Sequence, residues 1–142
     1  MSVIIEVAEA VKTEIESQEY SQNVAVRRAY KPVYELADRE TIQVTVIPAG
    51  VEISRVARGG DQYDVHIEVG IQKKFTNGDN DELDPLMTLV EEITDLFRRK
   101  RFFGSPVGVS MGVDNPHVFA PEHIDKKRMF TSVLSLTFRL IR

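Results

Sequence analysis

Residues 62–75 read QYDVHIEVGIQKKF and have the clearest strand pattern in the chain. Its apolar and polar side chains alternate strictly, with one set at Tyr63, Val65, Ile67, Val69 and Ile71 and the other at Asp64, His66, Glu68, Gln72 and Lys74. Successive side chains of an extended strand point to opposite faces, so the alternation predicts a long strand. One face is expected to be buried in a core, and the other to meet water or a partner.

The sequence on either side predicts further strands. Residues 41–47 alternate in the same way, and Val51 and Ile53 continue the pattern after a turn predicted at 48–50. Gly59 and Gly60 predict a hairpin, because glycine tolerates the positive φ angles of a tight turn. Residues 129–141 predict a second strong strand, and residues 23–30 and 107–113 predict weaker ones.

Two segments have the spacing of amphipathic helices. Residues 2–19 carry an apolar stripe opposite an acidic face, with Ser2 as the expected N-cap. Residues 82–101 carry a second stripe, with Asp84 expected to cap the helix ahead of Pro85 in its first turn.

This order of elements predicts an α+β fold: a two-layer, mostly antiparallel β-sheet with two amphipathic helices packed on one face. The chain has 142 residues, of which 42% are hydrophobic and 28% charged. These values predict a single domain spanning residues 1–142.

Composition excludes several classes of function. The chain has 18 basic and 22 acidic residues, and a net charge of −4 argues against a general duplex-binding protein. The absence of cysteine excludes disulfides, thiolate metal sites and thiol catalysis. We expect no signal peptide and no bilayer crossing, because no basic leader and no apolar run of about 20 residues is present.

Three short motifs suggest chemistry, and each has a simpler structural explanation. Residues 108–112 read GVSMG, the pattern of a serine-hydrolase nucleophile, but Pro116 follows too soon for the helix that such a serine needs. Asp64, His66 and Glu68 lie on one strand face, where two adjacent members could share a metal ion, yet any solvent-facing strand shows such a row. Residues 79–84 resemble a calcium loop without its glycine and final glutamate, and a turn before a helix explains them better.

Basic side chains gather at the end of the second predicted helix, at Arg98, Arg99, Lys100 and Arg101. Together with Arg27, Arg28, Lys31 and residues 126–128 they could form a patch that binds phosphates or an acidic protein surface. Compensation of the helix dipole explains the cluster equally well. Asp79 and Asp81, at the other end of the helix, could supply a patch of opposite sign.

Five stretches together carry a family resemblance: TIQVTVIP at 41–48, YDVHIEVGIQKK at 63–74, LMTLVEEI at 86–93, FAPEH at 119–123 and FTSVLSLTF at 130–138. With the N-terminal helix, they resemble the small neck and tail-completion proteins of long-tailed bacteriophages and prophages, especially the tail terminators. The likeness lies in the order of the elements and the general character of their sequences over nearly the whole chain, without an invariant catalytic motif.

The resemblance implies a structural virion protein with no catalytic residue, cofactor or metal. Tail terminators assemble as a hexameric ring on the tail tube, end its polymerisation and face the head connector. The implied partners are copies of the chain itself, the tail tube protein and the connector or head-closure protein, with no membrane and no sequence-specific nucleic acid. The protein would be made in the host cytoplasm and reside in the virion.

A closed ring needs two different patches on each subunit. The sequence offers the acidic Asp79 and Asp81, the basic cluster from Arg98 to Arg101, and the Gly59–Gly60 hairpin. Two alternatives stay open: a head-closure or connector protein of the same particle, and a nucleic-acid-binding module that uses residues 98–101.

Overall fold

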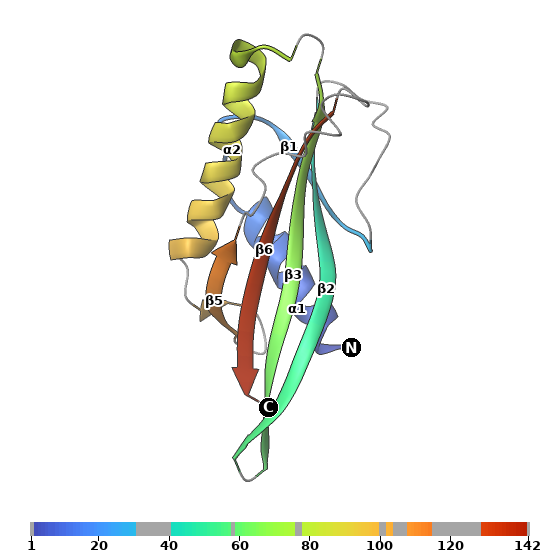
Figure 1. Cartoon of the computed structure of the whole chain (residues 1–142), viewed down its shortest axis with the longest axis vertical. Helices are drawn as coiled ribbons and strands as arrows, with labels where there is room; N and C mark the ends of the chain where they lie inside the picture. Colours follow the sequence, from blue (N-terminus) through green and yellow to red (C-terminus); the bar gives the residue numbers. More distant parts are fainter. Residues whose placement is uncertain are drawn as a thin grey trace.

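A computed structural model describes residues 2–30, 41–57, 59–75, 78–99, 102–103, 108–114 and 129–141. Within these residues the chain forms two helices and a six-stranded sheet, and the α+β class expected from the sequence is confirmed. The elements in chain order are α1 (Val3–Glu16), β1 (Val24–Arg28), β2 (Ile42–Ala57), β3 (Gly60–Lys74), α2 (Asn80–Arg99), β4 (Phe102–Phe103), β5 (Gly108–Asp114) and β6 (Met129–Ile141) (Figure 1).

The two strands with the strongest alternation lie at the centre of the sheet, whose order is β1-β2-β3-β6-β5-β4. β3 and β6 pair antiparallel from Gln62↔Ile141 to Lys74↔Met129. The predicted apolar faces of both strands are buried, and Val65, Ile67 and Leu134 are wholly inaccessible to solvent. Alternation alone had therefore indicated the correct inward face of each strand.

One feature of the sheet differs from the sequence prediction. Residues 48–50 do not form a turn: β2 runs through them, and a bulge between Pro48 and Gly50 shifts its register against β3. A bulge accommodates the missing N–H of proline without ending the strand. β1 pairs with β2 in parallel, although the rest of the sheet is antiparallel.

Both predicted helices are present with altered ends. α1 ends at Glu16 and not at residue 19, and Ser2 occupies the N-cap position without a side-chain cap bond. α2 begins at Asn80, so the predicted cap at Asp84 is wrong. The carboxylate of Asp79 accepts a hydrogen bond from the Glu82 main-chain N–H at 3.0 Å and caps the helix, while Pro85 lies inside it.

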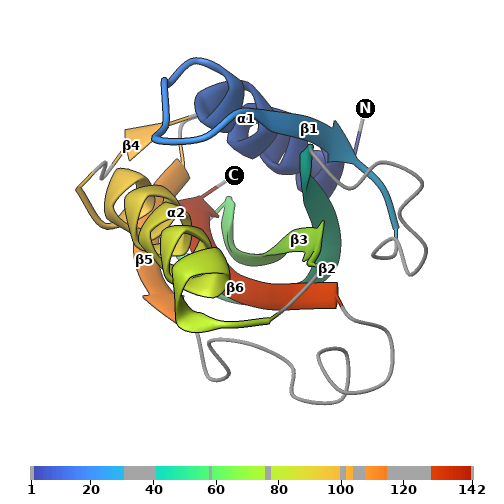
Figure 2. The same ribbon diagram turned by 90° about the horizontal axis from the view of Figure 1, so that it is seen from above.

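The helices cover one side of the sheet and enclose a single core. α1 contacts β1, β2 and β3, and α2 contacts β5 and β6, as Figure 2 shows from above. Apolar residues of both helices meet those of the strands in one cluster that includes Ile15, Ile93 and Phe138. At the α2–β6 contact the rings of Phe97 and Phe138 pack edge to face, with centroids 6.5 Å apart.

Candidate interaction surface

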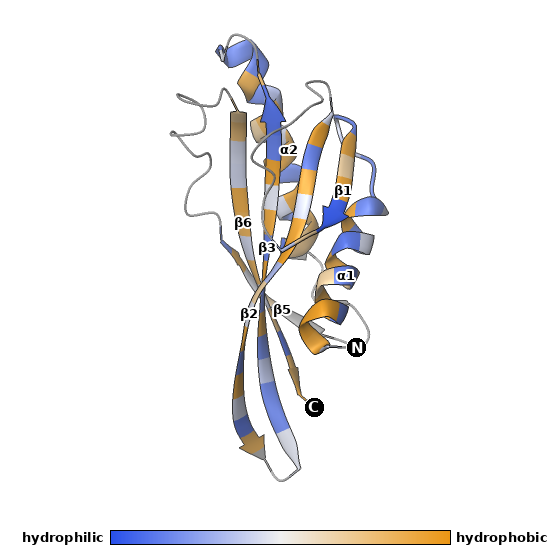
Figure 3. Cartoon of the chain, turned by 90° about the vertical axis from the view of Figure 1, so that its right-hand side faces the viewer, coloured by the Kyte–Doolittle hydropathy of each residue, from blue (hydrophilic) through white to orange (hydrophobic). Residues whose placement is uncertain are grey.

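The β2–β3 hairpin is longer than the helices that cover it. Strands of 16 and 15 residues span about 50 Å at roughly 3.3 Å per residue. Helices of 14 and 20 residues reach only about 21 and 30 Å. The hairpin must therefore extend past the helical layer, and Figure 3 shows it projecting beyond the rest of the fold. We call this projecting part, residues 50–57 and 60–63, the arm.

The arm exposes apolar side chains. Val51 is 42% exposed, Ile53 58% and Val56 51%, all within a stretch of six residues of β2. Val51 lies opposite Val65, and Ile53 lies opposite Tyr63 and shares its face with the core. The inward face of the sheet thus continues onto the arm, where no helix of the described chain covers it. Exposed apolar side chains such as Val51 and Ile53 on one face are typical of a contact surface.

One edge of the arm has no partner strand in the described residues. β1 pairs with β2 only as far as Val46, and the rest of β2 pairs with β3 alone. Free strand edges offer main-chain donors and acceptors to other chains, and proteins often guard them with proline, bulges or charge. Here the bulge beside Pro48 and the charged Glu52 and Arg55 flank the exposed apolar residues.

Gly59 and Gly60 lie at the tip of the arm, as predicted. Gly59 has a φ of 74°, in the region that favours glycine, and Gly60 pairs with Ala57. A side-chain carbon at Gly60 would lie 3.5 Å from Ile141, in ordinary contact. Only the first glycine is therefore needed for the turn itself.

Asp64 and His66, two of the three side chains in the possible metal row, contact neighbouring strands. The Arg139 guanidinium donates two hydrogen bonds to the Asp64 carboxylate, at 2.8 and 3.2 Å, and holds the pKa of Asp64 below its ordinary value. His66 lies 3.2 Å from the Thr137 hydroxyl through Nδ1 and 3.4 Å from Glu52 through Nε2, the latter without hydrogen-bond geometry. Among the described residues no group of three acids or histidines could hold a metal ion. Asp64 and His66 therefore make cross-strand contacts.

Ser110 of the GVSMG motif lies in β5 opposite Phe138, on a strand that continues to Asp114. A nucleophile elbow needs a sharp turn between a strand and a helix at the serine. The extended backbone at Ser110 does not have that conformation. His117 and His123, which follow the motif in sequence, lie outside the described residues.

The two ends of α2 carry opposite charges, as the sequence predicts. Asp79 and Asp81 lie at its start, although the Asp79 carboxylate serves as the cap. Arg98 lies near its end and pairs with Asp95 at 2.6 Å. Arg99 is the last helical residue, and Lys100 and Arg101 lie outside the described residues. An interface role for these groups stays a prediction.

The other predicted basic groups are only partly described. Arg28 of β1 donates to Glu9 of α1 at 2.5 Å and lies over the Tyr30 ring, 5.7 Å from its centroid. Lys31 and residues 126–128 lie outside the described residues. Arg28 and Arg98 therefore each pair with an acid of their own chain, which reduces their availability for phosphate.

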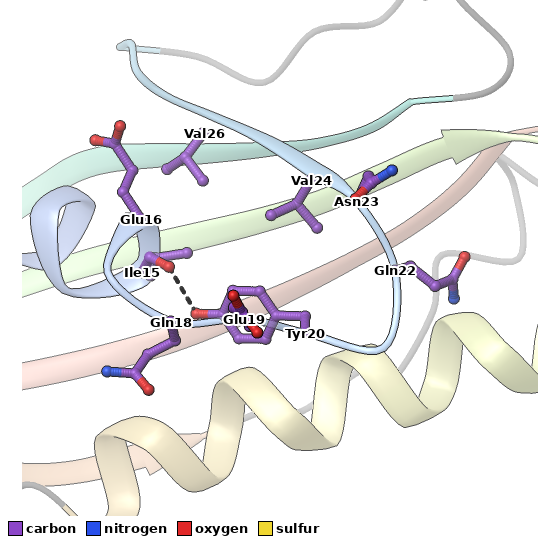
Figure 4. Close-up of a pocket in the computed structure, with 9 residues that line it drawn as sticks. All are labelled: Ile15, Glu16, Gln18, Glu19, Tyr20, Gln22, Asn23, Val24 and Val26. Carbon is purple, nitrogen blue, oxygen red and sulfur yellow. Dashed lines mark hydrogen bonds between the residues drawn. The ribbon is translucent and has the colours of Figure 1, made fainter.

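A pocket of about 490 Å³ lies between the end of α1 and β1. Ile15, Val24 and Val26 line it from the core side, and the rest of the lining is Glu16, Gln18, Glu19, Tyr20, Gln22 and Asn23 (Figure 4). The Tyr20 hydroxyl donates to the Ile15 carbonyl at 2.9 Å. Burial, helped by Glu14 and Glu92, raises the pKa of Tyr20 to about 12, so this side chain is a neutral wall of the pocket.

Two polar groups of the pocket are unpaired within the described residues. The side-chain nitrogen of Gln22 is buried without a hydrogen-bond partner. Glu19 is exposed and makes no ion pair there, whereas Glu16 is held by Lys12 at 2.7 Å. The pocket therefore combines apolar side chains, a free carboxylate and an unsatisfied amide.

No family model and no curated protein matches this chain. Neither helix in the described part of the chain is both long and apolar enough to cross a lipid bilayer.

Sequence reasoning identified the tip of the arm but missed its apolar side chains and the pocket. Val51 and Ile53 read as ordinary inward strand residues, because their alternation matches that of the core. The signal that could have revealed them is length, since the predicted strands are much longer than either predicted helix. The pocket brings residues of α1 and β1 together by tertiary packing and leaves no periodic pattern.

Proposed function

We propose that this chain is a structural protein of a long-tailed phage or prophage. It forms a ring at the head-proximal end of the tail tube, ends tube polymerisation and joins the tail to the head connector. Its partners are copies of itself, the tail tube protein and the connector, and it makes or breaks no covalent bond.

The observation that carries the proposal is the arm. Three apolar side chains, Val51, Ile53 and Val56, are exposed beside a free strand edge. A protein that acts alone gains nothing from such a surface, whereas a subunit of an assembly buries it at a contact. The α+β fold with both helices on one face agrees with the fold that the family resemblance implies.

The test is a tube-assembly reaction observed by electron microscopy. Purified tail tube protein of the same phage or prophage is polymerised with and without this chain. We expect ring-shaped density at one end of each tube and tubes that stop growing once it is present. Tubes of unchanged length without end density would refute the proposal.

Two binding assays, run beside the tube-assembly reaction, separate the alternatives. A head-closure protein would bind purified connector and leave tube growth unchanged. A nucleic-acid module would bind oligonucleotides with an affinity that falls steeply with salt. Reversing the charge of Arg98, Arg99 and Arg101 would abolish that binding, and under the ring proposal it weakens self-assembly or tail attachment instead.

A further inference from the structure

The arm extends past the helices and presents an edge that a further strand can join (Figure 3). Every residue from Val51 to Val56 is exposed, so side chains on both faces of β2 are open to solvent there. In the described residues β1 pairs with β2 only as far as Val46, and the ladder with β3 is regular from residue 50 to residue 55. This regular stretch offers main-chain donors and acceptors to another chain, and strand addition at an exposed edge is a common mode of recognition.

A second copy of the arm is the best apolar match for this stretch. Six large apolar side chains of the described chain are exposed: Tyr30, Val51, Ile53, Val56, Met111 and Ile141. Three of them lie within six residues of β2, and the other three come from three different segments. The arm is therefore where exposed apolar groups of the described chain gather, and two such groupings bury each other's surface when they meet. A twofold axis brings identical surfaces together, as in most protein dimers.

Symmetry and charge fix the register of the two paired strands. In an antiparallel pair, directly opposite side chains lie on the same face, so a twofold axis passes beside one residue that faces its own copy. The regular stretch is longest around an axis at Glu52 or at Ile53. An axis at Glu52 opposes two carboxylates, whereas an axis at Ile53 opposes two apolar side chains. The axis at Ile53 also sets Val51 opposite Arg55 of the second copy, and Glu52 opposite Ser54.

We propose that two copies of this chain pair through the free edges of their arms, antiparallel and centred on Ile53. The ladder joins the two sheets into one, and the exposed apolar face becomes continuous across the axis. The aliphatic part of each Arg55 covers the opposing Val51, while its guanidinium stays in water. A twofold pair closes on itself and differs from the head-to-tail contact of a ring, so this inference goes beyond the proposed function.

The paired arms form a weak, reversible contact. A ladder over residues 51–55 is small beside the standard interface, which buries roughly 800 Å² on each partner. The two Glu52 carboxylates also lie diagonally across the axis, where side chains of paired strands are about 7–8 Å apart and like charges repel. The free chain should therefore exchange between monomer and dimer as its concentration changes.

A single introduced thiol reports the pairing, because the chain has no cysteine. Ile53→Cys places two thiols opposite each other, with Cα atoms about 4.5–5.5 Å apart, within the range that a disulfide spans. Mild oxidation should give a disulfide-linked dimer in high yield. Val51→Cys is the matched control: its side chain is exposed on the same face, but its two thiols lie about 13 Å apart along the strands. Equal yields from the two variants, or no dimer from Ile53→Cys, would overturn the proposal.

Two lysine substitutions test the register without oxidation. Ile53→Lys places like charges opposite each other and should weaken dimerisation, measured by sedimentation velocity, by at least about tenfold. Ser54→Lys adds the same charge one residue along, but it faces Glu52 of the second copy twice in each dimer. It should tighten dimerisation by roughly two- to thirtyfold. Both positions are exposed in the single chain, so the urea midpoints of the monomeric variants should match that of the parent chain.

Equal weakening by the two lysine variants would overturn the register. A parent chain that stays monomeric at its highest soluble concentration would overturn the dimer. Association beyond the dimer that Ile53→Lys abolishes would mean that the arm binds a different surface, and would overturn the twofold pairing. All these measurements are made without tail tubes, so their outcome is independent of the tube-assembly test of the proposed function.

Discussion

Replacing Phe138 by alanine should destabilise the fold by about 3–5 kcal/mol, the usual cost of emptying a fully buried phenylalanine site. Phe138 is 0% exposed on β6, and its ring meets Phe97 of α2 edge to face. That aromatic contact adds about 0.5–1.5 kcal/mol to the effect of burial. The total is a large share of the roughly 5–15 kcal/mol that holds a typical domain together.

The assay is urea unfolding followed by circular dichroism. A loss of about 4 kcal/mol with a slope of about 2 kcal/mol/M lowers the midpoint by about 2 M. Leucine replacements of Phe97 and Phe138, singly and together, should show a coupling of about 1 kcal/mol in a double-mutant cycle. Alanine at the half-buried neighbour Thr137 serves as the control and should cost much less.

A small loss of stability at Phe138 together with a large one at Thr137 would contradict this prediction. A slip of β6 by one residue would exchange the buried and outward faces of the strand. The observed register, in which Phe138 lies opposite Val65, would then be wrong.

Three further outcomes follow from single contacts. Asp79→Ala should destabilise the fold by about 1 kcal/mol in urea unfolding, because α2 loses its cap, whereas Asp81→Ala should cost only a few tenths. Arg139 keeps the pKa of Asp64 in the folded chain below the ordinary 3.8. Between the lowered pKa and the ordinary value, the unfolded chain therefore binds more protons than the folded chain. Stability should therefore fall as pH drops through this range. The urea midpoint of the Asp64→Asn variant should decline less steeply with falling pH. Burial raises the pKa of Tyr20 from an ordinary 10.0 to about 12, so the stability that this shift contributes should be lost as pH rises between these values. Tyr20→Phe should remove both the ultraviolet titration of Tyr20 and the associated loss of stability.

Local patterns in the sequence were enough to predict most of the helices and strands and their inward faces. The alternation at 62–75 and 129–141 marked the two central strands, and two apolar stripes marked the helices. Gly59 marked the hairpin, because a tight turn needs a positive φ there. These features depend on local backbone geometry, whose repeat of two or 3.6 residues is written directly in the order of side chains.

Which distant groups meet depends on tertiary packing. It joined Asp64 to Arg139, placed β1 parallel to β2, made a bulge of the proline segment at 48–50, and set Asp79 as the cap of α2. It also left the arm uncovered and formed the pocket between α1 and β1. Such contacts depend on strand pairing and packing between residues far apart in the chain, and a local pattern carries no information about them.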